Sequence, residues 1–161
     1  MTDTAGRPVD DRGRGEPTRV IFVCTHNSAR SIMAEALLRD KGGPAYEVVS
    51  AGTEPSEVRP LTLRVLAEAG LPTEGLRSKS VSELIDQTFD YVITVCDSAR
   101  QRCPVFPGEG QRLHWGYDDP SGVEGSDEER LRAFRRVLTA LSQRIDLFLT
   151  LADKRETSDA H

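Results

Sequence analysis

The chain has 161 residues, which is enough for one domain with a buried core that needs no support from disulfides or a metal. Its three cysteines do not fit a secreted disulfide framework, and its formal net charge of -5 argues against broad nucleic-acid binding, which depends on clustered Lys and Arg. No stretch stays apolar over the roughly 18 residues that a membrane span requires, and no apolar leader with a cleavage site follows the N-terminus, so we expect a cytoplasmic monomer with no membrane contact.

The first part of the chain predicts a tail, a strand and a helix. Residues 1–17 contain almost no large apolar side chain, which is typical of a disordered tail. Residues 19–23 form a near-continuous apolar run, which predicts a central parallel strand that is buried on both faces. Over residues 32–39, apolar side chains recur at spacings of three and four, which predicts a helix that Gly42 and Gly43 end.

The middle of the chain continues this alternation. Residues 46–50 predict a second strand. Pro60 lies where the first turn of a second helix favours proline, and Gly70 closes that helix. Ser80 and Glu83 have the spacing of a capping box, which predicts a short third helix.

The last part of the chain predicts two more strands and two more helices. Residues 91–95 are apolar and rich in β-branched side chains, as a third strand requires, and residues 111–115 predict a fourth. Between them, the polar residues 97–102 predict a short helix. Ser126 begins a long helix with a capping box, and we expect a frayed C-terminal tail over residues 153–161. The apolar stripe of this helix consists of Leu131, Phe134, Leu138, Leu141, Ile145 and Phe148.

Strands that alternate with helices predict a single α/β domain over residues 18–152, with a four-stranded parallel sheet and helices on both faces. In such folds, ligands bind outside the carboxyl ends of the strands. Cys24, Cys96 and Asp119 all fall at such ends. We therefore expect these three side chains at one edge of the sheet.

The segment from Cys24 to Ser31 carries the expected chemistry. A cysteine between a buried strand and a helix start meets free backbone N–H groups and the positive end of a helix dipole, which suits a tetrahedral oxyanion. This setting predicts that the pKa of Cys24 falls into the ~3.5–7.5 range of activated cysteines. Arg30 adds a planar fork that binds two oxygens at once. The alternative is that Cys24 is one more buried cysteine.

Several short motifs follow one another along the chain. They are a C-x5-R-S loop at residues 24–31, Met33-Ala34-Glu35, Ser50-Ala51-Gly52, the pair Cys96 and Cys103, and the run from His114 to Pro120. Together they resemble the low-molecular-weight protein tyrosine phosphatase superfamily and, within it, the thioredoxin-coupled arsenate reductases. The resemblance covers about residues 19–151. It implies a phosphatase-like domain with flavodoxin-like winding.

The resemblance also implies roles for individual residues. Cys24 attacks the oxyanion, Arg30 stabilises it, and Asp119, the aspartate before the proline, is the general acid. Ser31 hydrogen-bonds the thiolate, and Asn27 shapes the loop by bracing a left-handed turn. A helix cap and an ordinary turn residue are the alternatives for these last two. The loop residues expected to bind the oxyanion are Thr25, His26, Asn27, Ser28, Ala29 and Arg30.

The cysteine pair implies that arsenate is reduced to arsenite through a thiol relay. Cys24 forms an arsenic adduct, Cys96 attacks the Cys24 sulfur and releases arsenite, and Cys103 then attacks Cys96. Thioredoxin, or a glutaredoxin-like reductant, reopens the final disulfide. Seven helical residues separate the two α-carbons of the pair by ~10.5 Å, and a disulfide allows ~7 Å, so the segment between them must unwind. The alternative is that both cysteines fill one helix face.

The sequence departs from these relatives at two positions. Ala29 stands where many of them carry a second loop cysteine, which the relay does not use. Some relatives bind a monovalent cation beneath the loop, and three of the four ligand positions correspond to Asn27, Glu35 and Ser50. The fourth aligns with Lys79, so we expect its ammonium group to replace potassium, with no cofactor bound. The alternative is that Lys79 is a solvated surface lysine.

Two other functions remain open at this point. A protein tyrosine phosphatase would use Cys24, Arg30 and Asp119 and leave the cysteine pair idle. Ser121 argues against it, because phosphatases of this family usually carry an aromatic residue after Asp-Pro. A non-catalytic oxyanion sensor would need neither the acid nor the relay. Neither His26 nor His114 recurs with cysteine or a carboxylate at the spacing of metal ligands. We therefore assign no metal.

Overall fold

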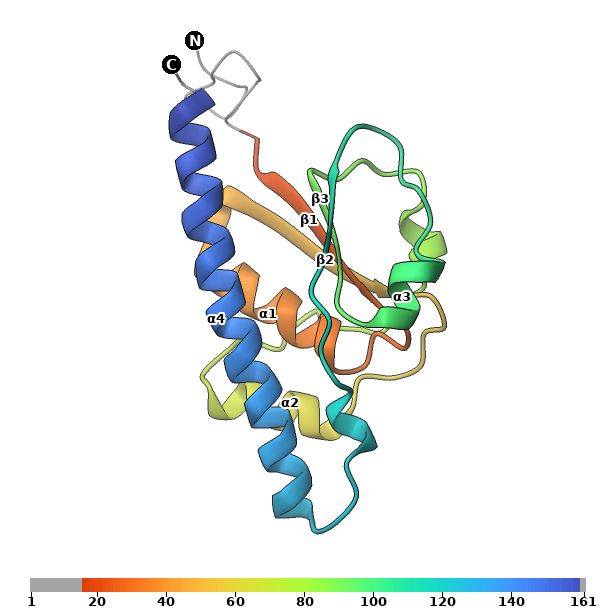
Figure 1. The fold of residues 1–161 in the computed structure, drawn as a ribbon. Coiled ribbons are helices and arrows are strands. Elements are labelled where there is room, and N and C mark those ends of the chain that lie inside the picture. Colours follow the sequence, from red (N-terminus) through yellow and green to blue (C-terminus); the bar gives the residue numbers. More distant parts are fainter. Residues whose placement is uncertain (1–15, 160–161) are drawn as a thin grey trace.

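The computed structural model describes residues 16–159, and at its centre is a four-stranded parallel sheet with the order β2-β1-β3-β4 (Figure 1). The strands are β1 (Thr18–Cys24), β2 (Tyr46–Gly52), β3 (Tyr91–Thr94) and β4 (Gln111–His114). All four were predicted, and the strand order is that of a flavodoxin-like winding.

The helices also follow the sequence prediction. They are α1 (Arg30–Gly42), α2 (Pro60–Glu68), α3 (Asp97–Arg102) and α4 (Asp127–Asp159), with the 3-10 turns η1 (Gly43–Ala45), η2 (Val81–Leu84) and η3 (Pro120–Gly122). The segment after Ser80 is a 3-10 turn, in which Ser80 Oγ accepts from the N–H of Ser82 in place of that of Glu83, and the Glu83 carboxylate pairs with Arg77.

The central strand β1 explains why its sequence is continuously apolar. It pairs with β2 on one side and with β3 on the other, and its residues 20–23 have no exposed surface. Burial of each such side chain stabilises the fold by ~1.5–3 kcal/mol relative to exposure. This strand ends at Cys24, so Cys24 lies at the carboxyl edge of the sheet. Its side chain is 2% exposed.

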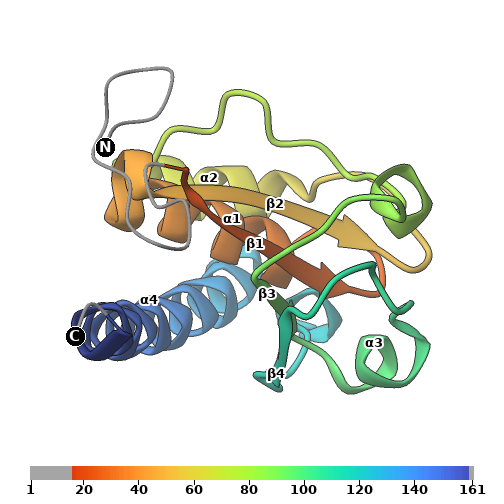
Figure 2. The same ribbon diagram turned by 90° about the horizontal axis from the view of Figure 1, so that it is seen from above.

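Helices cover both faces of the sheet (Figure 2). Neighbouring side chains of a strand point to opposite faces. Tyr91 of β3 packs on Phe148 of α4, with ring centroids 4.9 Å apart, and α1 packs on α4. Thr94 points to the other face, where it lines a hollow together with Arg100 of α3. The predicted two-sided arrangement is therefore confirmed.

The last helix begins as predicted and ends later. Ser126 Oγ accepts from the N–H of Glu129, whose carboxylate accepts from Ser126, so the capping box is formed. The predicted apolar stripe is buried. The helix runs to Asp159, so most of the stretch that the sequence predicts as a frayed tail is helical. The predicted N-terminal tail falls almost entirely outside the described residues.

Candidate active site

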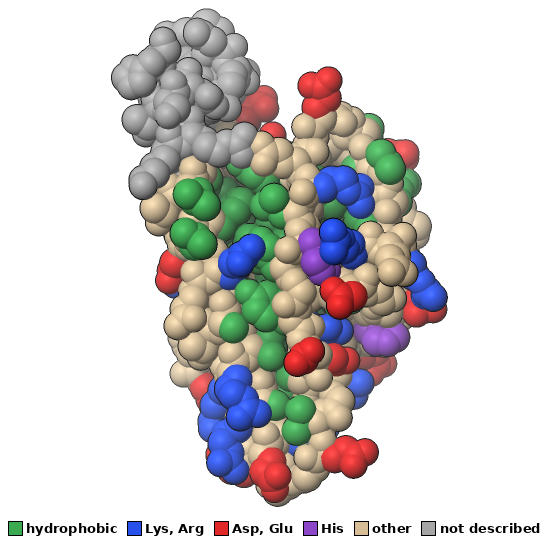
Figure 3. Space-filling model, in the orientation of Figure 1, with side chains coloured by type: hydrophobic (Ala, Val, Ile, Leu, Met, Phe, Trp, Pro, Cys, Tyr) green, Lys and Arg blue, Asp and Glu red, His purple; other side chains and the backbone are tan. Residues whose placement is uncertain are grey.

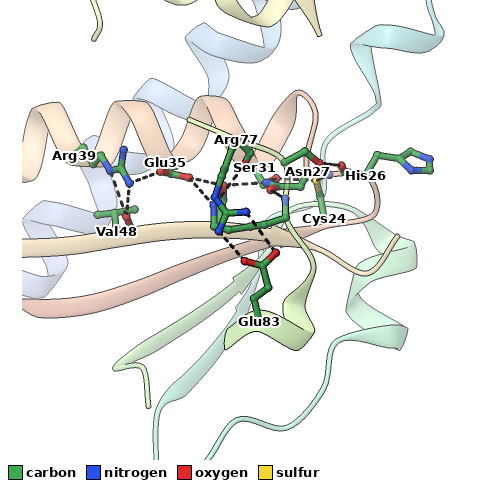
Figure 4. Close-up of polar contacts among 12 residues, drawn as sticks. Cys24, His26, Asn27, Ser31, Glu35, Arg39, Val48, Arg77 and Glu83 are labelled. Carbon is green, nitrogen blue, oxygen red and sulfur yellow. Dashed lines mark hydrogen bonds and ion pairs between the residues drawn. The ribbon is translucent and has the colours of Figure 1, made fainter. Parts of the chain in front are cut away.

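A tight loop after β1 surrounds the sulfur of Cys24 (Figure 4). The backbone N–H of Asn27 donates to Cys24 Sγ at 3.1 Å, and Ser31 Oγ lies 2.8 Å from the same sulfur. Asn27 has a φ of 51° and is the only non-glycine residue with positive φ in the part of the chain that the structure describes. Its side chain also donates to Ser31 Oγ at 2.8 Å. The expected left-handed turn is therefore present, and Asn27 makes polar contacts as well.

The backbone of this loop is turned so that its carbonyl groups face outward. Backbone N–H groups of residues 53–59 donate to carbonyls of the loop, and the acceptors are those of Cys24, Thr25, His26 and Ser28. In a trans peptide the C=O and the following N–H point in opposite directions, so the next N–H groups face inward. A Cβ at Gly52 would lie 2.5 Å from Thr25 O, so glycine lets β2 lie this close. The result is a cradle of N–H groups suited to an anion.

The residues predicted to bind the oxyanion differ in how their side chains lie. Asn27, Ser28 and Ala29 are buried, and Thr25 and Arg30 are half-buried. The ring of His26 is exposed and points away from Cys24, with Nδ1 at 3.0 Å from Glu54 O (Figure 4). His26 therefore offers only its backbone to a ligand at the sulfur.

Burial raises the pKa of the Cys24 thiol above its ordinary value. The hydrogen bonds with Ser31 and Asn27 act in the opposite direction, because they favour the thiolate, but they do not outweigh the loss of solvation. The predicted fall in the pKa of Cys24 is therefore wrong for the ligand-free protein. The sequence shows the N–H groups and the helix start, whereas the depth of the sulfur depends on how the loop packs.

Arg30 and Asp119 meet although they come from distant parts of the chain. Arg30 donates to Tyr117 O at 2.8 Å, and its Nη2 lies 3.7 Å from Asp119 Oδ2. Ser121 donates to Asp119 Oδ1 through its N–H and its hydroxyl, at 2.9 and 2.6 Å. Burial acts to raise the pKa of Asp119, but the Ser121 hydrogen bonds and the charges of Arg30 and Arg59 outweigh it and lower this pKa. The carboxyl group is thus ionised in the free site.

The cysteine pair occupies the two ends of α3. Cys96 is 5% exposed, and its sulfur lies 3.3 Å from Thr25 Oγ1, so it touches the Cys24 loop. Cys103 is half-buried at the far end, where its N–H donates to Ala99 O at 2.8 Å. The helix between them sets their α-carbons ~10.5 Å apart, and all three cysteines are free thiols.

Polar side-chain contacts hold both ends of α3, and the sequence did not predict these contacts. His114 links β4 to its neighbours, with Nδ1 2.7 Å from Thr94 Oγ1 and Nε2 2.8 Å from Asp97 Oδ1. At the other end, Arg102 lies 3.4 Å from Glu54. These contacts join strands and loops that only the folded sheet brings together, so no local pattern indicates them.

A buried polar cluster supports the loop from below. Asn27 donates to Ser50 Oγ at 2.9 Å, and Ser50 in turn donates to Glu35, which has no exposed surface. Arg39 pairs with the second oxygen of Glu35 (Figure 4), and Lys79 Nζ lies 4.0 Å from the first. The backbone N–H of Lys79 also donates to Asn27 Oδ1 at 2.9 Å. Arg39 is a further partner whose only signal in the sequence is its i,i+4 spacing from Glu35.

The position of Lys79 excludes one of the two interpretations of this residue. Its side chain is 9% exposed, so it is not a solvated surface lysine. Burial lowers the pKa of Lys79 and raises that of Glu35, and the attraction between the two groups opposes both shifts. The ammonium therefore contributes positive charge beside a buried carboxyl group.

The described residues contain neither a candidate metal site nor a helix suited to crossing a membrane. Across the described residues, no group of three or more His, Cys, Asp or Glu side chains is placed to hold a metal ion. No helix that the structure describes is both long and apolar enough to cross a bilayer. The chemical groups at the carboxyl edge of the sheet are thus the Cys24 loop, the arginine and carboxylate beside it, and the two cysteines of α3.

Comparison with known proteins identifies one phosphatase family and several arsenate reductases as similar to this chain. The family model described as low molecular weight phosphotyrosine protein phosphatase matches residues 19–158. The arsenate reductase of Halalkalibacterium halodurans is 38% identical over 129 residues, which make up 80% of this chain and 93% of that protein. The crystal structure of arsenate reductase from Archaeoglobus fulgidus is 34% identical with a TM-score of 0.66, over 81% of this chain and 98% of that one. The Corynebacterium glutamicum thioredoxin-dependent arsenate reductase Cg_ArsC1' is 31% identical with a TM-score of 0.59, over 84% of this chain and 65% of that one.

Proposed function

Because this chain belongs to the low molecular weight phosphotyrosine protein phosphatase family, we propose that it uses the family's oxyanion loop to reduce arsenate to arsenite. The observation that carries the proposal is the contact of Cys96 with the loop, 3.3 Å from Thr25 Oγ1, with Cys103 at the other end of the same helix. Phosphoester hydrolysis needs no second thiol. Reduction needs two electrons, which thiols supply by forming a disulfide.

Arsenate binds as a tetrahedral anion in the N–H cradle around Cys24. Arg30 already lies at the edge of this cradle, where it donates to Tyr117 O, and a planar guanidinium binds two oxygens of such an anion. Binding of the anion displaces water from the cradle, so the charge of Arg30 acts on the anion at low dielectric. The five residues from Thr25 to Ala29 contribute mainly their backbone to this step, whereas Arg30 adds its side chain.

The first chemical step joins the Cys24 sulfur to arsenic. A hydroxyl of dihydrogen arsenate is exchanged for the sulfur, and the thiol proton and the hydroxyl leave together as water. Asp119 is ionised beforehand, so it accepts this proton and delivers it to the departing oxygen. Ser31 stabilises the thiolate character that the sulfur gains during this attack, through its contact of 2.8 Å with the sulfur.

The second step reduces arsenic. The Cys96 thiolate attacks Cys24 Sγ, the sulfur–arsenic bond breaks, and its electron pair stays on arsenic, which leaves as arsenite. Cys103 then attacks Cys96, which releases Cys24 as a thiolate and leaves a Cys96–Cys103 disulfide. Thioredoxin reopens that disulfide, a choice supported by the thioredoxin-dependent relative from Corynebacterium glutamicum.

The relay requires α3 to open, and its contacts make this inexpensive. Within Asp97–Arg102 only Ala99 is buried. The ties at the two ends, from His114 to Asp97 and from Arg102 to Glu54, involve exposed carboxylates, and such pairs contribute roughly 0–1 kcal/mol. Local opening is cheapest where few apolar contacts are lost.

The arsenate reductase proposal is tested by turnover of arsenate with thioredoxin, thioredoxin reductase and NADPH. Wild type is compared with variants in which Cys24, Cys96 or Cys103 is changed to Ser. We expect each variant to lose repeated turnover. Full turnover in the Cys96 or Cys103 variant would remove the relay.

The same variants decide the second candidate, a phosphatase, which the match of residues 19–158 to a phosphatase family favours. Hydrolysis of p-nitrophenyl phosphate needs Cys24 but neither of the α3 cysteines. If hydrolysis is fast in all but the Cys24 variant and arsenate is not reduced by wild type, the phosphatase is the correct assignment.

We also propose that Lys79 takes the place of a monovalent cation beneath the loop. The ammonium lies 4.0 Å from Glu35, and the backbone of Lys79 holds Asn27, whose turn shapes the loop. A tethered charge at this position supports the loop without free potassium.

A further inference from the structure

Cys103 and Arg112 converge on one carbonyl group. Cys103 Sγ donates to Pro104 O at 3.6 Å, and Arg112 Nη1 donates to the same oxygen at 3.1 Å. Two donors on one acceptor lie close to each other, so the guanidinium is held beside the sulfur. Arg112 extends from β4, an edge strand of the sheet, whereas Cys103 follows the helix that must open.

The surroundings of the thiol are mostly cationic. Basic side chains and a histidine gather over β4 and α3 (Figure 3), where Arg100, Arg112 and His114 line a hollow of about 310 Å3. Arg112 pairs with no carboxylate among residues 16–152, whereas Arg102 pairs with Glu54. Asp97, an acidic residue at the start of α3, contacts His114 and not Arg112. The charge of Arg112 is therefore free to act on the sulfur.

Two effects on the Cys103 thiol oppose each other. Burial raises the pKa of Cys103, and the positive charge of Arg112, together with its hydrogen bond to the sulfur, acts to lower it. No other side chain has a resolved effect on this pKa. Without the guanidinium, a half-buried thiol would ionise still less readily.

We propose that Arg112 is a positioning residue for the last thiol of the relay, and that its guanidinium favours ionisation of Cys103 to the thiolate that opens the Cys24–Cys96 disulfide. This inference rests on the proposed function. The Cys103 thiolate attacks Cys96 Sγ, a Cys103–Cys96 bond forms, and the bond to Cys24 breaks. Cys24 leaves as a thiolate, so the charge passes from Cys103 to Cys24 and no electrons enter or leave the protein.

The position of Arg112 also fits the movement that the relay needs. Arg112 is fixed on the sheet, so it stabilises the thiolate before α3 opens. The disulfide that forms is uncharged and has no strong interaction with the guanidinium, so nothing holds Cys103 back once it has reacted. Arg112 therefore acts on the waiting thiol and not on the product.

The experiment measures the ionisation of Cys103 directly. In a protein with Cys24→Ser and Cys96→Ser, Cys103 is the remaining thiol, and its alkylation by iodoacetamide is followed over a range of pH. We expect Arg112→Gln to move the midpoint to higher pH and to slow alkylation near neutral pH by about threefold to tenfold, since a tenfold change corresponds to one pKa unit. Arg112→Lys is expected to restore most of the rate.

Arg100→Gln is the matched control, because it removes the same charge from the same hollow on α3. It is expected to leave the midpoint unchanged. An unchanged midpoint in Arg112→Gln, or an equal shift in both variants, would overturn the proposal. Alkylation needs no arsenate, so a failure here is distinguishable from a failure of the arsenate reductase proposal, which the turnover of the cysteine variants reports.

Discussion

At the scale of single residues, Cys24 and Asp119, the proposed nucleophile and acid, hold opposite protonation states. Burial keeps the proton on Cys24, whereas Ser121 and Arg30 favour the ionised form of Asp119. In the free site the proton is therefore on the sulfur of Cys24, and the Asp119 carboxylate is able to accept it. A buried neutral thiol is also protected from oxidation, because the thiolate is the reactive form. In the proposed reaction, the sulfur loses this proton only as the Asp119 carboxylate accepts it.

Asp119→Asn is expected to lower the rate of arsenate turnover by about 100-fold or more, since a positioned acid or base contributes ~10²–10⁴-fold. The amide keeps the shape of the side chain but cannot carry the proton. The measurement is kcat with the thioredoxin system. Asp118→Asn is the control, because this neighbouring carboxylate is exposed and is expected to be dispensable. Loss of turnover in the control with retention in Asp119→Asn would assign the proton carrier to Asp118.

Ser121→Ala is expected to raise the pKa of Asp119, because it removes the hydroxyl that donates to Asp119 Oδ1 at 2.6 Å. A carboxyl whose folded-state pKa is depressed stabilises the fold above its unfolded pKa of ~3.9, and this contribution is lost as pH falls through the folded value. The variant should therefore be less stable than wild type near neutral pH and equally stable in strong acid. The carboxyl pKa is measured by NMR titration. The same titration curve in both proteins would contradict this assignment.

Potassium is expected to leave the turnover of the wild type unchanged, because Lys79 already supplies a positive charge 4.0 Å from Glu35. Turnover is measured in potassium chloride and, as the control for ionic strength, in equal sodium chloride. A strong rate increase that is specific to potassium would refute the role of Lys79. Lys79→Met is expected to lower stability, because the buried Glu35 carboxyl group loses the attraction of the ammonium and keeps only Ser50 and Arg39 as partners.

At the scale of elements, α3 is the part of the fold built to change. Its six residues bury a single side chain, Ala99, and its ends are tied by a histidine–aspartate contact and an exposed ion pair, whereas residues 20–24 of β1 beside it are buried. The helix places Cys96 against the loop and keeps Cys103 out of reach until it opens. The same opening would carry the disulfide outward to a reductant.

Amide exchange of residues 97–103 is therefore expected to be faster in the oxidised protein than in the reduced protein. The reason is that the Cys96–Cys103 disulfide is incompatible with the helical spacing of ~10.5 Å. Exchange is measured by mass spectrometry on both forms. Exchange within α2, which contains no cysteine, is expected to be unchanged and serves as the control. Identical protection of α3 in the two forms would show that the helix does not open.

The sequence predicts elements well where local pattern decides them. Every strand of the sheet was predicted, as was the polar helix before Cys103, because apolar runs, caps and breakers act within a few residues. The turn after Ser80 differs in that the Ser80 hydroxyl accepts from the N–H of Ser82, one residue earlier than a capping box requires. The contacts of His114 and Arg112 were missed for a related reason, since they depend on which strand lies beside which.

At the scale of the whole molecule, the strand order β2-β1-β3-β4 assembles the site. It brings the ends of β1 and β3 together, so that Cys96 reaches the Cys24 loop, and it places the loop after β4 beside Arg30. The contiguous loop was predicted as a unit because its residues are neighbours in the chain. The depth of Cys24, and with it the raised pKa, comes from packing of the whole domain and was not predictable from the loop alone.

The central claim, a relay of three thiols, is tested most directly by arsenate reduction in Cys103→Ser. The account predicts that each protein molecule releases a single arsenite and then stops, with a Cys24–Cys96 disulfide that mass spectrometry identifies. Wild type treated in the same way is predicted to accumulate the Cys96–Cys103 disulfide and to continue when thioredoxin is supplied. Repeated turnover by Cys103→Ser with thioredoxin, or the absence of a Cys24–Cys96 disulfide after its single turnover, would contradict the account.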